Sequence, residues 1–189
     1  MKIDKTGTVD LETKRLKLRR FTLDDAQDMF DNWASDPAVT KYLTWPTHTS
    51  IEVTKAVLES WASNYADGAY FNWAIERKGS GKVIGSIAVV ALDEDIAAEI
   101  GYCLGRAYWG QGIMTEAVMA VLDHLFDAVG LNRVAAYHDA NNPRSGRVME
   151  KAGMKYEGIL RQAGRNNSGI CDKVCRAVIR SDRAQQNRS

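Results

Sequence analysis

The sequence predicts an α+β protein in which about four helices pack on one central, mixed but mostly antiparallel sheet of about seven strands. Hydrophobic residues recur at every second position in some stretches and at helical spacing in others. These stretches follow the order strand, two helices, three strands, helix, strand, helix, two strands, and the helical crossover between two strands makes that pair parallel. A chain of 189 residues suits one domain better than two. We therefore expect a single domain over residues 1–189, with its structured core at about 12–181.

The N-terminal part begins with a loose lead-in at residues 1–12, followed by a strand and a helix. Residues 15–19 alternate charged and apolar side chains, which predicts a half-buried strand with one face in water. Thr22 then stands where a helix cap is expected, and two aspartates follow it in the first turn. The apolar stripe of this helix consists of Ala26, Met29, Phe30 and Trp33.

A loop at residues 35–49 separates the first helix from the second. Its aromatic and apolar residues are Tyr42, Leu43 and Trp45. They favour either a lid or wall of an acceptor site, or simple packing of the loop on the core, and the sequence leaves both open. Ser50 is the expected cap of the second helix, which runs from residue 51 to about 66. The face at helical spacing is Val53, Ala56, Val57, Ser60 and Trp61.

Three strands with a period of two follow, at 71–76, 83–92 and 96–104. Gly85 interrupts the second of them and predicts a bulge or a close approach of another backbone. We expect the turn between the second and the third at residues 93–95. In the third strand Ala98, Ile100, Tyr102 and Leu104 share one face, and Glu99 lies on the other.

The second half of the chain contains the most regular helix of the sequence. Its apolar residues follow a helical spacing: Val118, Val121, Leu122, Leu125, Phe126 and Val129. Gly130 ends this helix, and a short buried strand follows at 133–138. A further helix spans 142–152 with Pro143 in its first turn. Strands at about 155–163 and 170–181 form a terminal hairpin, and we expect the polar tail 182–189 to be frayed.

A glycine-rich loop, Tyr108-Trp-Gly-Gln-Gly-Ile-Met-Thr115, joins the strand 96–104 to this regular helix. Glycines let the backbone turn sharply and approach a ligand, and the helix start offers unpaired N–H groups and a positive dipole end. The loop therefore suits a phosphate or diphosphate held by backbone amides, or is a plain strand-to-helix turn. It lacks the Lys-Ser or Lys-Thr of a P-loop and the third glycine of a dinucleotide fingerprint.

Composition excludes several other classes of protein. The net charge of +1 does not favour nucleic acid or an anionic membrane as a partner, and no apolar run is long enough to cross a bilayer. The N-terminus lacks the apolar core of a signal peptide, so we expect a cytoplasmic protein. The three cysteines form no C-x-x-C pair, and the three histidines have no ligand partners at metal spacing. We expect reduced thiols and no metal.

Two motifs in this order resemble the GNAT superfamily of acetyl-CoA-dependent N-acetyltransferases. The first is Trp109-Gly-Gln-Gly-Ile-Met-Thr-Glu-Ala117, and the second is Asn142-Pro-Arg-Ser-Gly-Arg-Val-Met-Glu-Lys-Ala-Gly153. The opening Thr13-Lys-Arg-Leu-Lys-Leu-Arg19 and the strand segment Glu99-Ile-Gly-Tyr102 resemble the RimJ/RimL-like branch, which acetylates N-terminal amines of ribosomal proteins. The resemblance covers about residues 12–181 and implies a GNAT-like domain.

The resemblance implies acetyl-CoA as cosubstrate and assigns residues to it. The loop amides would hold its diphosphate, and the residues that contribute are Trp109, Gly110, Gln111, Gly112, Ile113, Met114 and Thr115. The pantetheine arm would pair like an extra strand with Tyr102, Cys103 and Leu104, and Asn142 and Ser145 would contact it. The acceptor would be an amine, either a protein N-terminus or a small amine such as a polyamine, amino acid or aminoglycoside. The protein would act as a monomer or a homodimer.

Direct transfer of an acetyl group to an amine requires three groups on the enzyme: a general base, a donor to the oxyanion and a donor to the leaving thiolate. We expect Glu99 to be the general base, the backbone N–H of Cys103 to stabilise the oxyanion, and Ser145 to protonate or hydrogen-bond the leaving thiolate. The alternatives are a solvated carboxylate for Glu99 and a helix cap for Ser145. Many superfamily members carry a catalytic tyrosine where this chain has Met149. A non-catalytic acyl-CoA-binding module is the remaining alternative, against which Glu99, Asn142 and Ser145 together argue.

Overall fold

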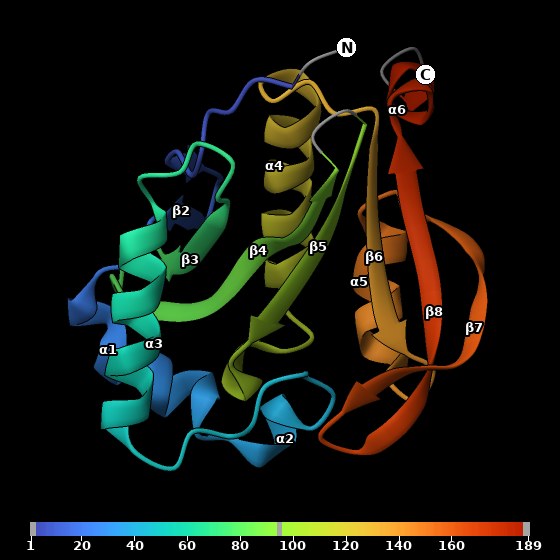
Figure 1. Cartoon of the computed structure of the whole chain (residues 1–189). Coiled ribbons are helices and arrows are strands. Elements are labelled where there is room, and N and C mark those ends of the chain that lie inside the picture. The colour runs from blue at the N-terminus through green and yellow to red at the C-terminus, as the bar shows by residue number, and fades with distance from the viewer. Residues whose placement is uncertain (1–2, 94–95, 187–189) are drawn as a thin grey trace.

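The computed structural model describes residues 3–93 and 96–186, and it shows one mixed sheet with helices on both faces (Figure 1). Eight strands lie in the order β1-β2-β3-β4-β5-β6-β8-β7. Their bounds are β1 Leu11–Glu12, β2 Leu16–Arg19, β3 Asn72–Arg77, β4 Val83–Asp93, β5 Ala97–Leu104, β6 Arg133–Asp139, β7 Lys155–Asn166 and β8 Gly169–Ile179. Every neighbouring pair is antiparallel except β5 and β6, which are parallel. The predicted fold class is confirmed, and β1 is the strand that the sequence did not indicate.

The helices form two layers. Their bounds are α1 Ala26–Met29, α2 Pro37–Thr40, α3 Ile51–Asn64, α4 Ile113–Asp127, α5 Pro143–Lys151 and α6 Arg180–Gln186. Helices α4 and α5 cover one face of the sheet, and α1 and α3 cover the other face over β3 and β4 (Figure 1). The predicted stripe of α4 is confirmed, since its members Val118, Val121, Leu122, Leu125, Phe126 and Val129 are all buried. In the part of the chain that is described, no helix has the length and apolar character needed to span a membrane.

The predicted face of α3 is wrong in part. Val53 and Ala56 are exposed, whereas Thr54 and Leu58 are buried. The Thr54 hydroxyl lies 2.8 Å from Nδ1 of the buried His48. A polar residue can therefore lie on the inner face because a partner from the preceding loop satisfies it. Hydrophobic periodicity cannot detect such a pair.

Residues 3–12 and 182–186 are more regular in structure than the sequence indicated. In the predicted lead-in, Ile3 and Thr8 are buried and the Trp73 indole donates to the carbonyl of Val9 (2.8 Å). At the other end, the predicted fraying from residue 182 is wrong as far as Gln186, because this stretch forms α6. Arg183 of α6 pairs with Asp123 of α4. In the predicted turn 93–95, residues 94 and 95 lie outside the described part of the chain.

The central feature of the sheet is that β5 and β6 pair and then part. Pairing begins at Ala97 and ends at Glu99, opposite Ala135. Beyond this point β5 stays paired with β4 as far as Leu104, and β6 stays paired with β8 as far as Asp139. The register of β4 against β5 shifts between Val89 and Ala91, at the same level. A bulge there increases the local twist and turns the β4–β5 pair away from β6 (Figure 1).

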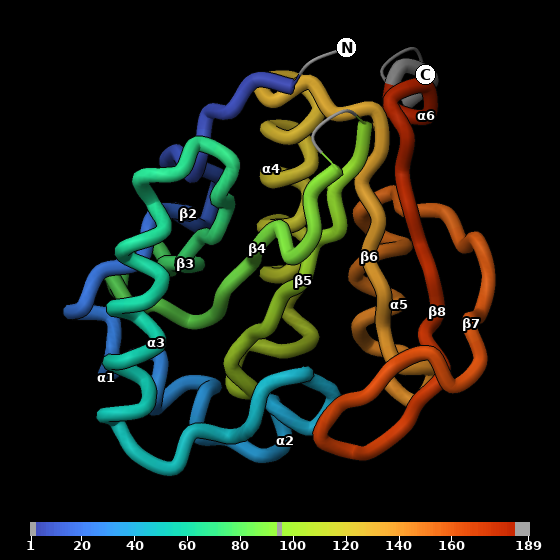
Figure 2. The backbone as a smooth tube through the Cα atoms, viewed as in Figure 1, coloured from blue at the N-terminus to red at the C-terminus, as the bar shows by residue number. Residues whose placement is uncertain are grey.

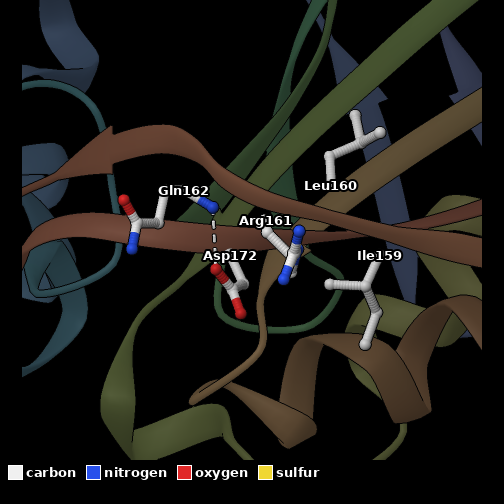
Figure 3. Close-up of a pocket in the computed structure, with 5 residues that line it drawn as sticks. All are labelled: Ile159, Leu160, Arg161, Gln162 and Asp172. Atoms are coloured by element: carbon white, nitrogen blue, oxygen red, sulfur yellow. Dashed lines mark hydrogen bonds between the residues drawn. The ribbon is translucent and has the colours of Figure 1, made fainter.

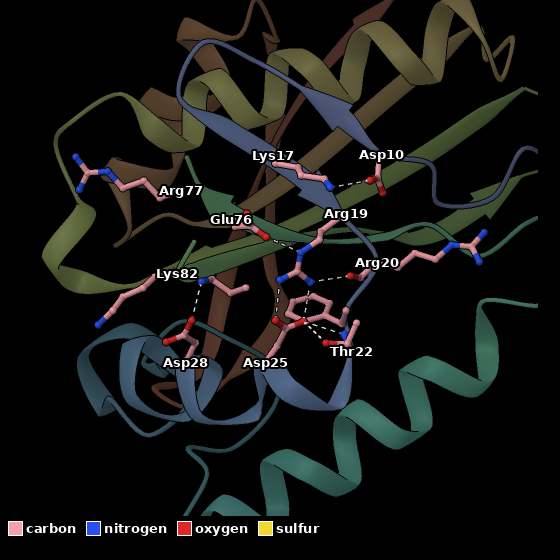
Figure 4. Close-up of polar contacts among 12 residues, drawn as sticks. Asp10, Lys17, Arg19, Arg20, Thr22, Asp25, Asp28, Glu76, Arg77 and Lys82 are labelled. Atoms are coloured by element: carbon pink, nitrogen blue, oxygen red, sulfur yellow. Dashed lines mark hydrogen bonds and ion pairs between the residues drawn. The ribbon is translucent and has the colours of Figure 1, made fainter. Parts of the chain in front are cut away.

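An ion cluster joins the start of the chain's first helical segment to the sheet. Arg19 of β2 donates two hydrogen bonds of 2.8 Å to the carboxylate of Asp25 and one of 2.6 Å to Glu76 of β3 (Figure 4). Asp25 also accepts from the backbone N–H of Thr22 (2.8 Å), just before the helical turn 23–25. Asp25 is buried. The hydrogen bonds that Arg19 donates, to Asp25 first and then to Glu76, raise the pKa of Arg19 above its ordinary value, although burial lowers it.

We expect Arg19→Met to lower the free energy of unfolding by about 2–4 kcal/mol, because it leaves a buried carboxylate without its cation. Urea unfolding measures this. The matched control is Lys17→Met on the same strand, which removes the more exposed ion pair with Asp10 (3.2 Å) and should cost less than about 1 kcal/mol. Equal losses for the two variants would contradict the structural role of the cluster.

Candidate active site

The parting of β5 from β6 leaves backbone groups of β5 without a strand partner. Arg133 N–H donates to the Ile96 carbonyl (3.1 Å), so the even-numbered residues of β5 turn their polar groups toward β6. Gly105 N–H donates to the Ile84 carbonyl (2.8 Å), so the odd-numbered ones turn theirs toward β4. By this alternation the N–H groups of Tyr102 and Leu104 face the gap between β5 and β6 beyond Glu99, which we call the opening. This is the sheet edge at which an extended ligand can pair as an additional strand.

The same alternation contradicts the expectation that the backbone N–H of Cys103 stabilises the oxyanion. Its position opposite Ser86 turns its N–H toward β4, away from the opening. The side chain is buried with Sγ 3.3 Å from the Ser86 hydroxyl. Burial raises the pKa of this thiol to about 11, so it stays protonated near neutral pH. Cys103 therefore offers neither an N–H to the opening nor a thiolate nucleophile.

The glycine-rich loop has the geometry of an anion-binding turn. Gly110 and Gly112 have φ angles of 75° and 73°, a left-handed conformation that glycine adopts without steric cost. The first intrahelical bond of α4 runs from Glu116 N–H to the Gly112 carbonyl (3.1 Å). The N–H groups of residues 113–115 therefore have no acceptor within the helix. The side chains of Ile113 and Met114 are buried in the core, so these residues can offer only their backbone to a ligand.

Trp109 connects this loop to β5 and to α5. Its indole N–H donates to the Leu104 carbonyl (2.7 Å), which fixes the loop against the free edge of the strand. The Arg144 guanidinium lies 5.4 Å from the centre of its ring. The exposed side chain of Arg144, at the start of α5, therefore lies beside the loop. The starts of α4 and α5 lie at the same end of the sheet, where β5 and β6 diverge (Figure 1).

At the start of α5, Ser145 contacts a tyrosine instead of capping the helix. Asn142 is the cap, and its side-chain oxygen accepts from Ser145 N–H (3.4 Å). The Tyr102 hydroxyl donates to the Ser145 carbonyl (3.0 Å) and lies 3.0 Å from the Ser145 hydroxyl. Burial raises the pKa of Tyr102, and the Ser145 hydrogen bond offsets this only in part. A protonated phenol thus lies beside Ser145, while Met149 is buried in the core.

The opposite face of the opening carries Glu99 and residues that the sequence did not indicate. Glu99 is half-buried and lies at the last paired position before the strands part. Alternation along β6 places Tyr137 on this same face. A hydrogen bond with Cys175 raises the pKa of Tyr137, as do burial and the nearby charge of Glu99. The Lys173 ammonium lies 4.2 Å from the centre of the Tyr137 ring.

Below the opening, the tip of the β7–β8 hairpin is fastened to the loop that follows α2 (Figure 2). The Asn167 side chain donates to the carbonyls of Thr40 (2.9 Å) and Trp45 (2.8 Å), and its N–H donates to the Leu43 carbonyl (3.2 Å). Ser168 adds a hydrogen bond to the Lys41 carbonyl (3.2 Å). Leu43 and Trp45 also pack on the core cluster beneath α3. The loop therefore packs on the core and is fastened to the hairpin at the same time.

A hollow of about 610 Å³ at the outer strand β7 is separate from this opening. Its lining consists of Ile159, Leu160, Arg161, Gln162 and Asp172 (Figure 3). Gln162 has a φ of 51°, and its N–H donates to the Asp172 carboxylate (2.7 Å), which holds the bulge of β7. None of the residues that the sequence assigned to the site lines this hollow. Among the described residues, no three His, Cys, Asp or Glu side chains are grouped so as to hold a metal ion.

A family model described as an acetyltransferase (GNAT) domain matches residues 15–155. The chain belongs to the GNAT acetyltransferase family. It is an acetyltransferase, and acetyl-CoA is its cosubstrate. The predicted resemblance is thereby confirmed.

Relatives of known name agree with this membership. The chain is 35% identical over 171 residues to the uncharacterized N-acetyltransferase YoaA of Bacillus subtilis (strain 168), covering 90% of this chain and 96% of that one. It is 38% identical over 66 residues to the ribosomal-protein-serine acetyltransferase of Escherichia coli (strain K12), which covers 35% and 37% of the two chains. The crystal structure of a GNAT-family acetyltransferase from Bacillus anthracis superposes with a TM-score of 0.80 at 25% identity, covering 90% and 98%.

We expect Gly85→Ala to destabilise the GNAT domain by about 1–3 kcal/mol, the usual cost of overpacking a tight site. A Cβ atom there would lie 2.4 Å from the Cys103 carbonyl oxygen, so the predicted close approach of another backbone is confirmed. The control is Gly101→Ala, whose Cβ would meet only the exposed Val90 side chain (3.1 Å). Thermal unfolding of both variants measures the difference. If Gly85→Ala is as stable as the control, β4 does not fix the position of the free edge of β5.

Proposed function

We propose that this acetyltransferase transfers the acetyl group of acetyl-CoA directly to a primary amine, and that a protein N-terminal amine is its acceptor. The observation that carries the proposal is the opening between β5 and β6. On one face it meets the starts of α4 and α5, and on the other it meets Glu99. Two substrates can thus approach the same gap from opposite faces of the sheet and react in one ternary complex.

The face with the helix starts suits acetyl-CoA. The N–H groups of residues 113–115, at the positive end of the α4 dipole, would hold the diphosphate. The edge of β5 at Tyr102 and Leu104 would pair with an amide group of the pantetheine arm, as an added strand does. The carboxamide nitrogen of Asn142 would be a further donor, because its oxygen is already used to cap α5.

The opposite face suits the amine and its proton. The amine nitrogen forms a bond to the thioester carbon while the carbon–sulfur bond breaks, and the proton leaves toward Glu99 through a water molecule. Of the N–H groups of Tyr102 and Leu104, one would pair with the pantetheine arm and the other would stabilise the oxygen that becomes negative. The Ser145 hydroxyl would donate a hydrogen bond or a proton to the departing thiolate, or the Tyr102 hydroxyl would do so in place of its bond to the Ser145 carbonyl. No acyl-enzyme is formed, since Cys103 is a buried thiol.

A coenzyme A release assay with a panel of acceptors tests the proposal. The E. coli relative named for a ribosomal protein supports a peptide N-terminus as the acceptor. The panel therefore contains short peptides with free N-termini, the same peptides with blocked N-termini, and polyamines, amino acids and aminoglycosides. Turnover that needs a free peptide N-terminus supports the proposal. Turnover with small amines alone points to the alternative substrate class, and tight binding without turnover points to an acyl-CoA-binding module.

For the base, we expect Glu99→Gln to lower turnover by about 10²–10⁴ with little change in acetyl-CoA affinity. The loss should shrink as the pH rises, because an increasing fraction of the amine is then already deprotonated. The matched control is Glu157→Gln on the same face, whose carboxylate pairs with Arg133 (2.6 Å), and it should turn over like the wild type. Wild-type turnover of Glu99→Gln at neutral pH would remove Glu99 from the mechanism.

For the leaving group, we expect Tyr102→Phe and Ser145→Ala each to lower turnover about tenfold to a hundredfold. The two hydroxyls contact each other at 3.0 Å, so the double variant should be little worse than the worse single variant. Turnover at saturating acetyl-CoA is measured for the wild type, both single variants and the double variant. The control is Tyr156→Phe, an exposed tyrosine of β7. Losses that multiply in the double variant would mean that the two groups act independently.

A further inference from the structure

Arg15 lies in the segment of residues 3–15, which we call the N-terminal arm. It holds the glycine-rich loop, about a hundred residues away in sequence. Arg15 directly precedes β2 and lies against the start of α4. Its Nη1 donates to the Gln111 carbonyl (2.9 Å), and its Nε donates to the Glu116 carboxylate (2.6 Å). Its backbone N–H donates to the other oxygen of that carboxylate (2.9 Å). One side chain therefore spans both sides of Gly112, the residue at which the loop becomes a helix.

The arginine also lies directly beside the left-handed glycine. A Cβ atom on Gly112 would lie 3.7 Å from Nη2 of Arg15, so the guanidinium faces the turn itself. Segment 109–115 contains no lysine or arginine. The conformation of this turn decides where the N–H groups of residues 113–115 point. A bidentate arginine is suited to fixing it because its planar fork keeps two acceptors at a set spacing.

Glu116 makes the arginine electrostatically necessary. Burial works against its charge, but hydrogen bonds from Thr13 (2.6 Å) and Arg15 outweigh this and lower the pKa of Glu116 below its ordinary value. The group is therefore a carboxylate at neutral pH, in the first turn of α4, close to where an anionic ligand would bind. Without a cation it would repel a diphosphate. Arg15 neutralises it and at the same time keeps it turned toward the N-terminal arm.

We propose that Arg15 is a positioning residue for acetyl-CoA binding: it holds the Gln111–Gly112 turn in its binding conformation and neutralises Glu116. This rests on the proposed role of the loop in holding the diphosphate. Arg15 thus acts on the diphosphate half of the cosubstrate and not on the reacting thioester.

The decisive experiment compares two acetyl donors with the full-length protein. S-acetylpantetheine carries the thioester and the pantetheine arm but no diphosphate. We expect Arg15→Met to raise KM for acetyl-CoA about tenfold, the effect of one lost charge-assisted hydrogen bond, with kcat unchanged. KM for S-acetylpantetheine should stay at the wild-type value. The KM of Arg15→Lys for acetyl-CoA should lie between those of the wild type and Arg15→Met, because an ammonium keeps the charge but lacks the planar fork of the guanidinium.

The matched control tests whether loosening the N-terminal arm is sufficient. Lys78 donates to the Glu12 carboxylate (2.9 Å) and to the Thr13 carbonyl (2.8 Å), so it fastens the same arm without contacting the loop. Lys78→Met should keep wild-type KM values for both donors. Equal increases for both donors in Arg15→Met, or an increase in Lys78→Met as large as in Arg15→Met, would overturn the inference in favour of a purely structural role.

Gly112→Glu separates this inference from the function on which it rests. The variant places a negative side chain where the diphosphate would lie and should abolish acetyl-CoA binding measured by calorimetry. If it does so while Arg15→Met and Arg15→Lys both bind like the wild type, the loop is the diphosphate site and the inference about Arg15 is wrong. If Gly112→Glu also binds normally, the loop is only a turn, and the proposed cosubstrate site fails together with the inference.

Discussion

The separation of β5 from β6 after Glu99 is the constraint on which the rest of the site depends. Each strand keeps its outer neighbour, so only one edge of each is left without backbone partners. The bulge around Val90 provides the bend, and Gly85 lets β4 remain close to Cys103 despite it. A free edge inside a sheet would be costly if it stayed unpaired, and a ligand with amide groups of its own removes that cost.

This separation also divides the chemistry between the two faces of the sheet. Side chains alternate along β5, so Tyr102 points toward α5 and Ser145 while Glu99 points to the opposite face. Tyr102 and Cys103 are neutral near pH 7, and burial raises the pKa of each still further. A group able to donate a proton is thus on the face of the helix starts, and a group able to accept one is on the other. The bond between nitrogen and carbon would form in the gap between them.

Periodicity and element order were sufficient to predict the fold class, the parallel pair and the buried stripe of α4, because these depend on local pattern and connection rules. The sequence also indicated the close approach at Gly85. It missed whatever depends on pairing between distant segments: the buried Thr54–His48 pair, the placement of Arg15 on the loop, and Tyr137 beside Glu99. The direction of the Cys103 N–H belongs to this group. Alternation gives two choices, and only the register with β4 and β6 selects between them.

Asp139, at the end of β6, connects the β7–β8 hairpin to the start of α5. One of its carboxylate oxygens accepts from the Asn166 side chain (2.7 Å) and the other from Asn141 N–H (2.7 Å). Asn166 precedes the hairpin tip that is fastened to the loop after α2, and Asn141 precedes the cap of α5. Asp139 is buried, and hydrogen bonds from Asn141 and Asn166 outweigh burial and lower its pKa, so it accepts from both as a carboxylate. The hairpin tip, with the loop after α2, and the helix that carries Ser145 therefore share one anchor. Because the hairpin tip, the loop and α5 are all held through Asp139, the position of the loop after α2 and the position of the Ser145 hydroxyl depend on one another.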